Sequence, residues 1–499
     1  MSMDGLGSKI LGGASWMVGF RFAQRSLGIV STIILARLLV PEDFGLVAMA
    51  VVVFGILELM GAFGFDLALI RDQKASRRHY DAAWTCNLIY FSVSGLVFAL
   101  CAPIVADFFG DPRLIPIVYV LAFVAVLQGF ENIGVVGFRK ELRFHKEFQF
   151  QVIKKLVAFT VTVILAFMLR NYWALVWGML ASRASGVALS FAMHPYRPRP
   201  SLSAVRELFG FSSWVLLNNL ATYTRGRGPD LIIGRLSGAD ALGVYRIAKE
   251  IAMLPNSELY QPIMRAVFPG FSKVSSDLSR LRPIYADVQG AVATVTVPAS
   301  IGIVMLADPI VTLLLGQNWL LAIPVIQVLG LAGVIQVLQG NRYSLFMALG
   351  QPYWITVMLL LEASVMLPLM AYLLIQGYGI ELAVWARVVG ALVVMPFGVA
   401  LVTKKLEMSA SRLSSALWRP VVATGVMALA LHMILRELPE PESELSALTQ
   451  LLIGVPAGAA IYAVTLMALW VVVGRPHGSE ARFLRLVGLR KFCSSEQAL

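Results

Sequence analysis

The amino-acid sequence predicts an all-α polytopic membrane protein with about fourteen transmembrane helices. Of its 499 residues, 58% are apolar and only 14% are charged, whereas soluble domains contain about 25% charged residues. The apolar residues form continuous runs of about 20, which is the length of a helix that crosses the hydrocarbon core. The strands of a membrane β-barrel would instead alternate apolar and polar residues, so that class is excluded.

Fourteen apolar runs are long enough to span a membrane. The first, seventh and eighth contain charged residues, so twelve spans remain the alternative count. The fourteen runs cover residues 12–36, 44–65, 83–106, 114–136, 150–169, 172–193, 210–234, 243–267, 285–307, 319–340, 353–375, 379–402, 417–435 and 448–473.

Basic residues alternate between the two sides of these predicted spans. One set of connecting segments carries most of the Lys and Arg residues, and we therefore assign it to the cytoplasm together with both termini. The net charge of +12 then reflects membrane topology, and it does not indicate nucleic-acid binding. The opposite set contains only Arg37, Arg113, Arg170, Arg235 and Arg436.

The two halves of the chain resemble each other. Residues 13–50 align without a gap with residues 211–248, an offset of 198 at which a Trp, an Arg and a Gly coincide. Six predicted spans separate the two copies, and both copies begin at a basic end. The sequence therefore predicts two pseudo-symmetric six-helix lobes followed by two C-terminal helices. Lobes of this kind that rock around a shared site are typical of transporters.

This repeat divides the chain into four parts. We expect an N-terminal lobe at 1–195, a C-terminal lobe at 196–405, an additional helix pair at 406–475 and a cytoplasmic basic tail at 476–499. Within the tail, residues 482–492 are basic and amphipathic. They are compatible with a helix on the membrane surface and with a solvated tail.

Three motifs resemble those of polysaccharide transport proteins. They are Ala-Arg-Leu-Leu-Val-Pro-Glu-Asp-Phe-Gly-Leu at 36–46, Gly-Phe-Asp-Leu-Ala-Leu-Ile-Arg at 64–71 and Phe-Arg-Lys-Glu-Leu-Arg-Phe at 138–144. On these motifs the chain is similar to the Wzx-like flippases of the multidrug/oligosaccharidyl-lipid/polysaccharide exporter superfamily. The resemblance covers about residues 8–405 well and the last two spans loosely.

The resemblance implies both an activity and a location. Wzx-like flippases move undecaprenyl-diphosphate-linked oligosaccharide repeat units across the bacterial inner membrane by alternating access. These units build exopolysaccharide, capsule or O-antigen. We therefore expect this lipid-linked sugar and the membrane lipids as partners, with the polymerase and the export machinery as further candidates, and no cofactor.

Charged residues inside the predicted spans are the candidate site residues. A charge at mid-bilayer costs roughly 3 to 17 kcal/mol by different measures, so such side chains face a watery cavity or a partner. Arginine suits a diphosphate because its fork of donors binds paired oxygens. The candidates for a cationic substrate cavity are Arg21, Gln24, Arg25, Arg227, Arg246 and Lys249.

Structural ion pairs are the alternative role for these residues. Arg21 or Arg25 could form a salt bridge with Glu58 or Asp66, and Arg227 could pair locally with Asp230. Arg246 and Glu250 are spaced for an intrahelical pair, which would leave Lys249 without a carboxylate partner.

A helix break is expected in the seventh span. Gly226, Gly228 and Pro229 lie within four residues of one another, and we expect them to interrupt the helix and act as a hinge. If protons drive transport, a carboxyl group must bind a proton from one side and release it to the other. The candidates for this ion coupling are, in order, Asp230, Glu58 and Glu250.

The sequence argues against an enzyme. It has no Gly-x-x-x-x-Gly-Lys-Ser/Thr loop for ATP and no Cys/His cluster spaced for a metal ion. The alternatives are a drug/cation antiporter of the same superfamily, and a membrane-embedded polysaccharide polymerase or glycosyltransferase. The sequence leaves open the identity of the sugar, the coupling ion and the oligomeric state.

Overall fold

The computed structural model describes residues 24–60, 65, 69–70, 72, 75–205 and 213–474. All regular elements in these ranges are helices. Contacts divide the chain into two units, one with Met1–Leu220 and Ile233–Gly243 and one with Ala221–Ile232 and Val244–Leu499. Arg21 and the predicted tail at 476–499 lie outside the described residues, as do the first residues of the repeat.

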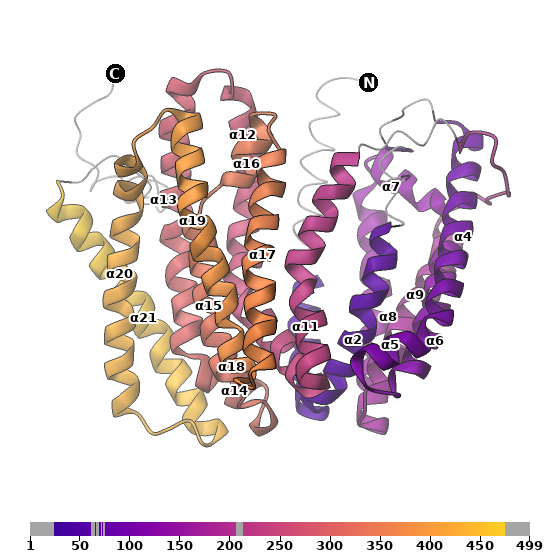
Figure 1. Cartoon of the computed structure of the whole chain (residues 1–499), viewed down its shortest axis with the longest axis horizontal. Coiled ribbons are helices and arrows are strands. Elements are labelled where there is room, and N and C mark those ends of the chain that lie inside the picture. Colours follow the sequence, from indigo (N-terminus) through magenta and orange to yellow (C-terminus); the bar gives the residue numbers. More distant parts are fainter. Residues whose placement is uncertain are drawn as a thin grey trace. The chain divides into compact units, whose positions relative to one another are not determined.

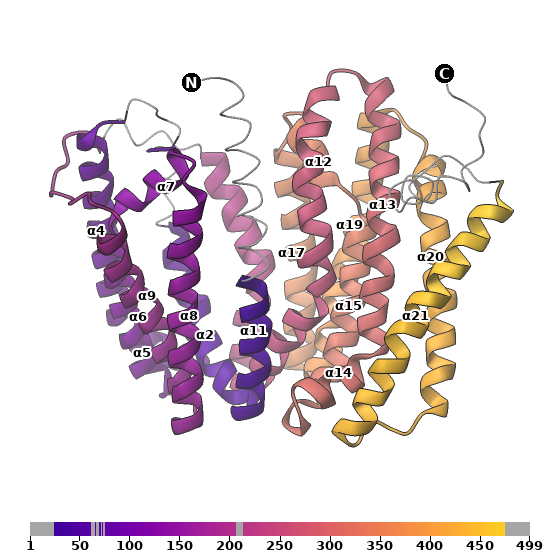
Figure 2. The same cartoon turned by 180° about the vertical axis from the view of Figure 1, so that it is seen from behind.

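Unit 1 begins, in its described part, with a helix at residues 24–38. Its long helices pack in pairs, α4 against α6 and α8 against α9, and they run side by side in Figure 1 and Figure 2. The elements that follow the first helix are α2 (Pro41–Met60), α4 (Arg77–Leu100), α5 (Ala102–Phe109), α6 (Leu114–Gly129), η1 (Ile133–Val135), α7 (Val136–Lys140), α8 (Phe144–Leu169) and α9 (Trp173–Met193).

Unit 2 contains most of α11 (Ser213–Ala252) and every later helix. Within it α13 packs against α15 and α20, α17 against α19, and α20 against α21. The elements after α11 are η2 (Asn256–Tyr260), α12 (Gln261–Val274), α13 (Leu278–Met305), α14 (Ala307–Leu314), η3 (Gln317–Trp319), α15 (Ala322–Leu338), α16 (Arg342–Ala348), α17 (Tyr353–Ile375), α18 (Gly379–Ala383), α19 (Trp385–Leu406), α20 (Ala410–Glu437) and α21 (Glu444–Val472).

Nine helices in the described part of the chain are long and apolar enough to cross a membrane. A tenth candidate is α6 together with η1 and α7, which are bent by 64°. Residues 24–38, α2 and α11 are also helical where further spans are predicted. The all-α membrane architecture is therefore confirmed, whereas the count of fourteen spans stays a prediction.

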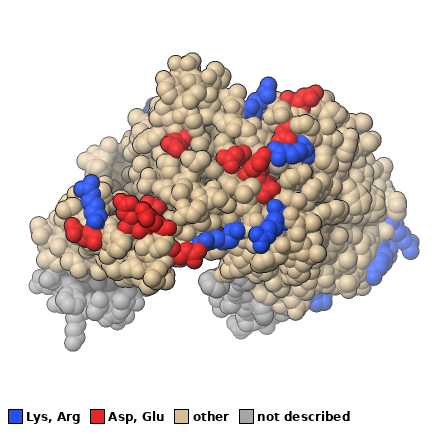
Figure 3. Space-filling model, turned by 90° about the horizontal axis from the view of Figure 1, so that it is seen from below, with Lys and Arg blue, Asp and Glu red and all other residues tan. Residues whose placement is uncertain are grey.

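Large apolar side chains are exposed along the outer faces of these helices. On α21, for example, Leu445, Leu452, Val464 and Val472 are all exposed. Soluble monomers rarely expose apolar patches larger than a few hundred Å², so surfaces of this kind fit contact with lipid chains. An end view shows acidic and basic side chains scattered among uncharged ones (Figure 3).

α11 folds back on itself at Gly238. This residue has a φ of 83° and a ψ of −174°, in the region that favours glycine because it has no Cβ. Two contacts demonstrate the reversal, since Lys249 reaches the carbonyl of Gly226 and Arg246 reaches Asp230. In a straight helix, residues 226 and 249 would lie about 34 Å apart. α11 is therefore a pair of antiparallel arms.

The expected break at Gly226, Gly228 and Pro229 is not observed. Residues 213–237 are helical throughout, with Pro229 inside the helix. A proline is tolerated in a spanning helix where other groups satisfy the backbone oxygens that it frees. Pro229 frees the carbonyl of Arg225, four residues earlier. Lys249 Nζ donates to the adjacent carbonyl, that of Gly226, at 2.8 Å. The expectation of a break inside this span was therefore wrong. The turn at Gly238 lies in the segment expected to connect the spans at 210–234 and 243–267.

Two glycines allow close packing at the tip of α11 in unit 1. A Cβ on Gly45 would overlap the carbonyl group of Ala239, and a Cβ on Gly243 would overlap that of Pro41. The repeat offset of 198 relates Gly45 to Gly243 and Pro41 to Ala239. The same contact is therefore made twice in reciprocal fashion, as at a two-fold axis.

The segment after α9 is tied to α4 in unit 1. The Tyr196 hydroxyl donates to Asp81 Oδ1 at 2.5 Å, and the backbone N–H of Arg199 donates to the same oxygen at 2.9 Å. Burial raises the pKa of the Tyr196 phenol, so its hydroxyl remains a donor at physiological pH. Asp81 thereby fixes the start of the segment that leads to α11.

Replacing Gly45 with Ala should lower the melting temperature of the detergent-solubilised chain. The added methyl group strikes the Ala239 backbone, and overpacking of this kind costs about 1–3 kcal/mol or more. Gly226→Ala is the matched control. Nothing lies within 4 Å of a Cβ at that position, and alanine is the better helix former. A Gly45→Ala protein that unfolds at the wild-type temperature would contradict the close contact.

Candidate functional site

A buried carboxylate is the centre of a charge cluster in unit 2. Asp230 lies on the first arm of α11, and its side chain is 1% exposed. Its Oδ2 lies 3.2 Å from Arg227 Nη1 and 3.4 Å from Arg246 Nη1, and its Oδ1 lies 3.9 Å from Lys249 Nζ. A buried charge without partners costs several kcal/mol, so these three cations are what permit its burial.

The reversal of α11 brings these residues together. Arg227 lies one turn before Asp230 on the first arm. Arg246 and Lys249 lie three residues apart on the second arm, and therefore share a face. The cluster consequently depends on the Gly238 turn as much as on the charged residues themselves.

The three cations around Asp230 keep part of their surface open. Their side chains are between 24% and 39% exposed, whereas the carboxylate that they share is buried. Each cation thus satisfies Asp230 from one side and retains exposed surface for another partner. Such an arrangement can bind an anion without leaving Asp230 unpaired.

A second layer of charge lies beside this cluster in unit 2. Arg225 forms an ion pair with Glu362 of α17, with 2.7 Å between Nε and Oε2. Arg387 of α19, which is buried, donates to the Tyr245 hydroxyl at 3.2 Å. Lys249 Nζ lies 5.4 Å from the centre of the Tyr245 ring. Tyr245 therefore connects the buried guanidinium of Arg387 to the exposed cation Lys249.

Positive charge exceeds negative charge in this part of unit 2. Five cations, two on each arm of α11 and one on α19, interact with three carboxylates, since Glu250 interacts electrostatically with Arg246. The excess of two positive charges favours an anionic ligand. The residues counted here are Arg225, Arg227, Arg246, Lys249 and Arg387, with Asp230, Glu250 and Glu362.

The structure brings together four of the predicted site residues, Arg227, Asp230, Arg246 and Lys249. One detail of the expectation was wrong, because Lys249 was expected to lack a carboxylate partner. It lies near Asp230, since the α11 turn places the two arms side by side. Sequence spacing along one helix could not reveal a partner on another arm.

Of the remaining cavity and coupling candidates, Glu250 lies on the second arm of α11 in unit 2, where it interacts electrostatically with Arg246. The others belong to unit 1 or are not described. Arg21 lies outside the described residues. Gln24 and Arg25 are in the helix at 24–38, and the Gln24 carbonyl accepts a hydrogen bond from Lys155. Glu58 forms an ion pair with Arg183 of α9, at 3.2 Å.

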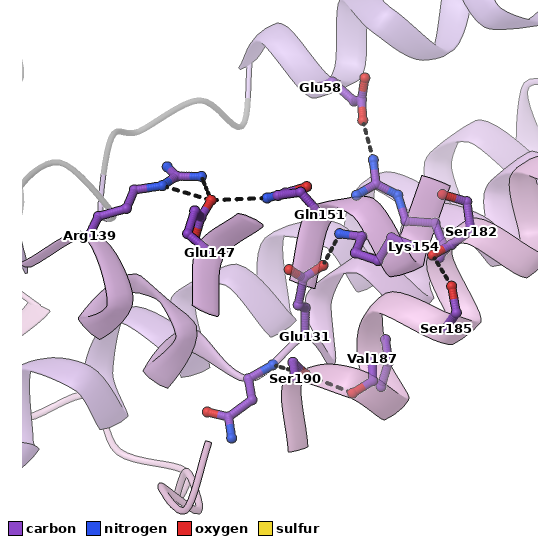
Figure 4. A network of polar contacts seen from close by, with 12 residues as sticks. Glu58, Glu131, Arg139, Glu147, Gln151, Lys154, Ser182, Ser185, Val187 and Ser190 are labelled. Atoms are coloured by element: carbon purple, nitrogen blue, oxygen red, sulfur yellow. Dashed lines mark hydrogen bonds and ion pairs between the residues drawn. The ribbon is translucent and has the colours of Figure 1, made fainter. Parts of the chain in front are cut away.

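Figure 4 shows a network of polar side chains in unit 1. Arg139 pairs with Glu147 at 2.7 Å, and Gln151 donates to the same carboxylate at 3.2 Å. Farther along α8, Lys154 pairs with Glu131 at 3.4 Å. The network thus follows α8 from its exposed first turn into the helix bundle.

Three cations of unit 1 were not among the candidate site residues although they lie within predicted spans. Lys154 and Lys155 lie within the predicted span at 150–169, and Arg183 lies within the span at 172–193. These residues could have been found from the sequence, because each is a charged residue inside an apolar run.

Among the described residues, no group of His, Cys, Asp and Glu side chains is arranged to hold a metal ion.

Comparison with known families identifies relatives of this chain. The profile of the family described as "Polysaccharide biosynthesis protein" matches residues 34–324. The lipopolysaccharide biosynthesis protein WzxC of Escherichia coli is 27% identical over 353 residues, which are 69% of this chain and 70% of WzxC. The succinoglycan biosynthesis transport protein ExoT of Rhizobium meliloti is 25% identical over 458 residues, 91% of each chain.

Two solved transporters have a similar fold. The "Lipid II flippase MurJ, inward closed conformation" superimposes with a TM-score of 0.72 at 10% identity, over 91% of this chain and 99% of MurJ. An inward-facing multidrug resistance MATE family transporter of the MOP superfamily gives 0.57 at 16% identity, over 78% and 96% of the two chains. At these identities the likeness concerns the fold alone.

The family match spans more than half of the chain. The resemblance carried by the three sequence motifs is therefore confirmed. The chain belongs to the family of polysaccharide biosynthesis proteins, and it is a Wzx-like, multi-pass membrane transport protein rather than an enzyme.

Proposed function

We propose that the protein is a flippase for polyprenyl-diphosphate-linked oligosaccharides in a bacterial inner membrane. It carries undecaprenyl-linked repeat units from the cytoplasmic to the outer leaflet for assembly into a surface polysaccharide. The observation that supports this proposal is the group of three partly exposed cations around one buried carboxylate. The lipid tail stays in the bilayer while the polar head crosses.

A diphosphate matches the chemistry of this cation group. Arg227 and Arg246 present forks of donors that bind paired phosphate oxygens, and Lys249 adds a compact point charge. The net positive charge of the cluster would repel a cationic drug. This charge balance favours a lipid diphosphate over the drug or cation that an antiporter of the same fold would carry.

The predicted topology is part of the proposal. Both termini lie in the cytoplasm, and the lobes at 1–195 and 196–405 alternate access to the substrate, with the helix pair at 406–475 added to the second lobe. The alternating basic and nearly neutral connecting segments support this orientation.

Asp230 provides a route to ion coupling within the same cluster. Three neighbouring cations pair with its carboxylate. A substrate diphosphate that draws Arg227 and Lys249 toward itself would loosen these pairs and release Asp230 to take up a proton. Glu58 and Glu250 are second choices, because their interactions with Arg183 and Arg246 fit a structural role.

The variants Arg227→Gln and Lys249→Gln should each reduce polysaccharide export by at least about tenfold, the effect of losing about 1.4 kcal/mol of substrate binding. The measurement is export in a deletion strain complemented with each variant, normalised to the protein in the membrane. Arg280→Gln is the matched control, because the pair of Arg280 with Asp277 is exposed and exposed pairs contribute little. Normal export by an Arg227/Lys249 double variant would contradict the site.

The deletion strain also tests the proposed activity itself. Lipid-linked repeat units should accumulate on the cytoplasmic face if the protein is a flippase. Accumulation on the outer face would indicate a polymerase and would overturn the proposal.

Asp230→Asn should uncouple transport from the proton gradient. Asparagine keeps the shape of the side chain and cannot titrate, so flipping should persist but lose its response to a protonophore. The measurement is movement of lipid-linked oligosaccharide in inverted membrane vesicles with and without the protonophore. Unchanged dependence on the gradient would exclude Asp230 as the coupling group.

Inorganic diphosphate should stabilise the Asp230→Asn protein more than the wild type. The substitution leaves three cations without their shared carboxylate, and a bound anion compensates by replacing it. The measurement is the shift in melting temperature of each purified protein on addition of diphosphate. Equal shifts in the two proteins would show that the anion does not bind among these cations.

A further inference from the structure

The polar network of unit 1 forms a stripe on one face of α8. Glu147, Gln151 and Lys154 are four and three residues apart, which places them on the same face of the helix. Figure 4 shows Gln151 and Lys154 among the side chains of Glu58 and Glu131. The stripe therefore lies within unit 1, and it is separate from the cations of α11.

Two ion pairs border this stripe and remain partly open. Lys154 pairs with Glu131, and Arg183 pairs with Glu58. The four side chains are between 14% and 38% exposed. α8 and α9 both qualify as spanning helices, and charges in such helices face a partner or water. These residues have a partner and also keep exposed atoms.

The charge balance here differs from that in unit 2. Each of the two pairs contributes one cation and one carboxylate, so the pairs carry no net charge. They present N–H donors and carboxylate acceptors close together, and Gln151 adds an amide that offers both. A sugar hydroxyl group donates one hydrogen bond and accepts others. The pattern therefore suits a neutral, hydroxyl-rich ligand better than an anion.

We propose that the Glu58–Arg183 and Glu131–Lys154 pairs, together with Gln151, form a subsite in unit 1 for the uncharged sugar portion of the substrate. This inference rests on the proposed flippase function, and it assigns the sugar to a different group of residues from the diphosphate. The competing role is structural, in which the two pairs only hold α2, α8, α9 and the end of α6 together.

The test compares the lipid diphosphate with and without its sugar. The full chain is placed in lipid nanodiscs, and its affinity is measured for undecaprenyl diphosphate and for the lipid-linked repeat unit extracted from a polymerase-deficient strain. Arg183→Gln and Lys154→Gln should each bind the sugar-bearing lipid at least about tenfold more weakly, with unchanged affinity for the sugar-free lipid. Lys249→Gln should weaken the binding of both lipids.

Exchanging the two residues of the Glu58–Arg183 pair distinguishes a role in sugar recognition from a purely structural role. In Glu58→Arg/Arg183→Glu the ion pair and the charge balance are kept, but the donors and acceptors change places. If the pair only holds helices together, this variant should bind the sugar-bearing lipid as the wild type does. If the pair recognises the sugar, binding should remain weak although the melting temperature recovers.

Several results would overturn the subsite. One such result is that the Arg183→Gln and Lys154→Gln variants change the affinity for both lipids equally or for neither. Another is that the double exchange restores binding of the sugar-bearing lipid. Gln151→Leu breaks no ion pair and carries the same expectation, so it decides the matter if the charge variants fold poorly. A wild-type protein that binds neither lipid would instead overturn the proposed function, which distinguishes the two failures.

Discussion

Burial of the Asp230 carboxylate is the constraint on which the organisation of unit 2 depends. This group can leave water only because Arg227, Arg246 and Lys249 surround it. Two of those cations are on the opposite arm of α11, so burial requires that the arms lie antiparallel. The turn at Gly238 provides that geometry. A carboxylate that needs three cations also concentrates positive charge at one place.

The same cluster contacts the backbone of the turn before Pro229. A proline removes one backbone hydrogen bond, the one to the carbonyl four residues earlier. Lys249 donates to the neighbouring carbonyl, that of Gly226, while it also lies near Asp230. One ammonium group therefore contacts the backbone of the first arm and contributes to the charge cluster. A ligand that engages Lys249 would disturb both interactions.

The all-α membrane architecture could be predicted from the sequence, because membrane helices are recognised by their apolar length. The division into two lobes stays a prediction. The charged candidates of α11 were likewise visible as charges within apolar runs. Their partners were not visible, since Asp230 with Arg246 and Glu58 with Arg183 pair across separate helical segments. The break expected at Gly226, Gly228 and Pro229 was wrong because glycine and proline spacing reports only local propensity, whereas the folded chain keeps this stretch helical. Lys154 and Arg183 were overlooked although, like Arg227, they are charges within apolar runs.

The two halves share a scaffold but differ in chemistry at equivalent positions. The offset of 198 relates Asp230 to Thr32 and Lys249 to Val51, so the cation cluster of unit 2 has no counterpart in unit 1. It also relates Glu58 to Asn256, whose side-chain amide donates to Gln336 at 2.9 Å. A charged residue in unit 1 thus corresponds to a neutral residue in unit 2, although the offset does not relate their partners Arg183 and Gln336. The glycines that allow close backbone packing, Gly45 and Gly243, are by contrast the same in both halves. The repeat therefore preserves backbone contacts where a side chain would clash, while the charged side chains differ between the two halves.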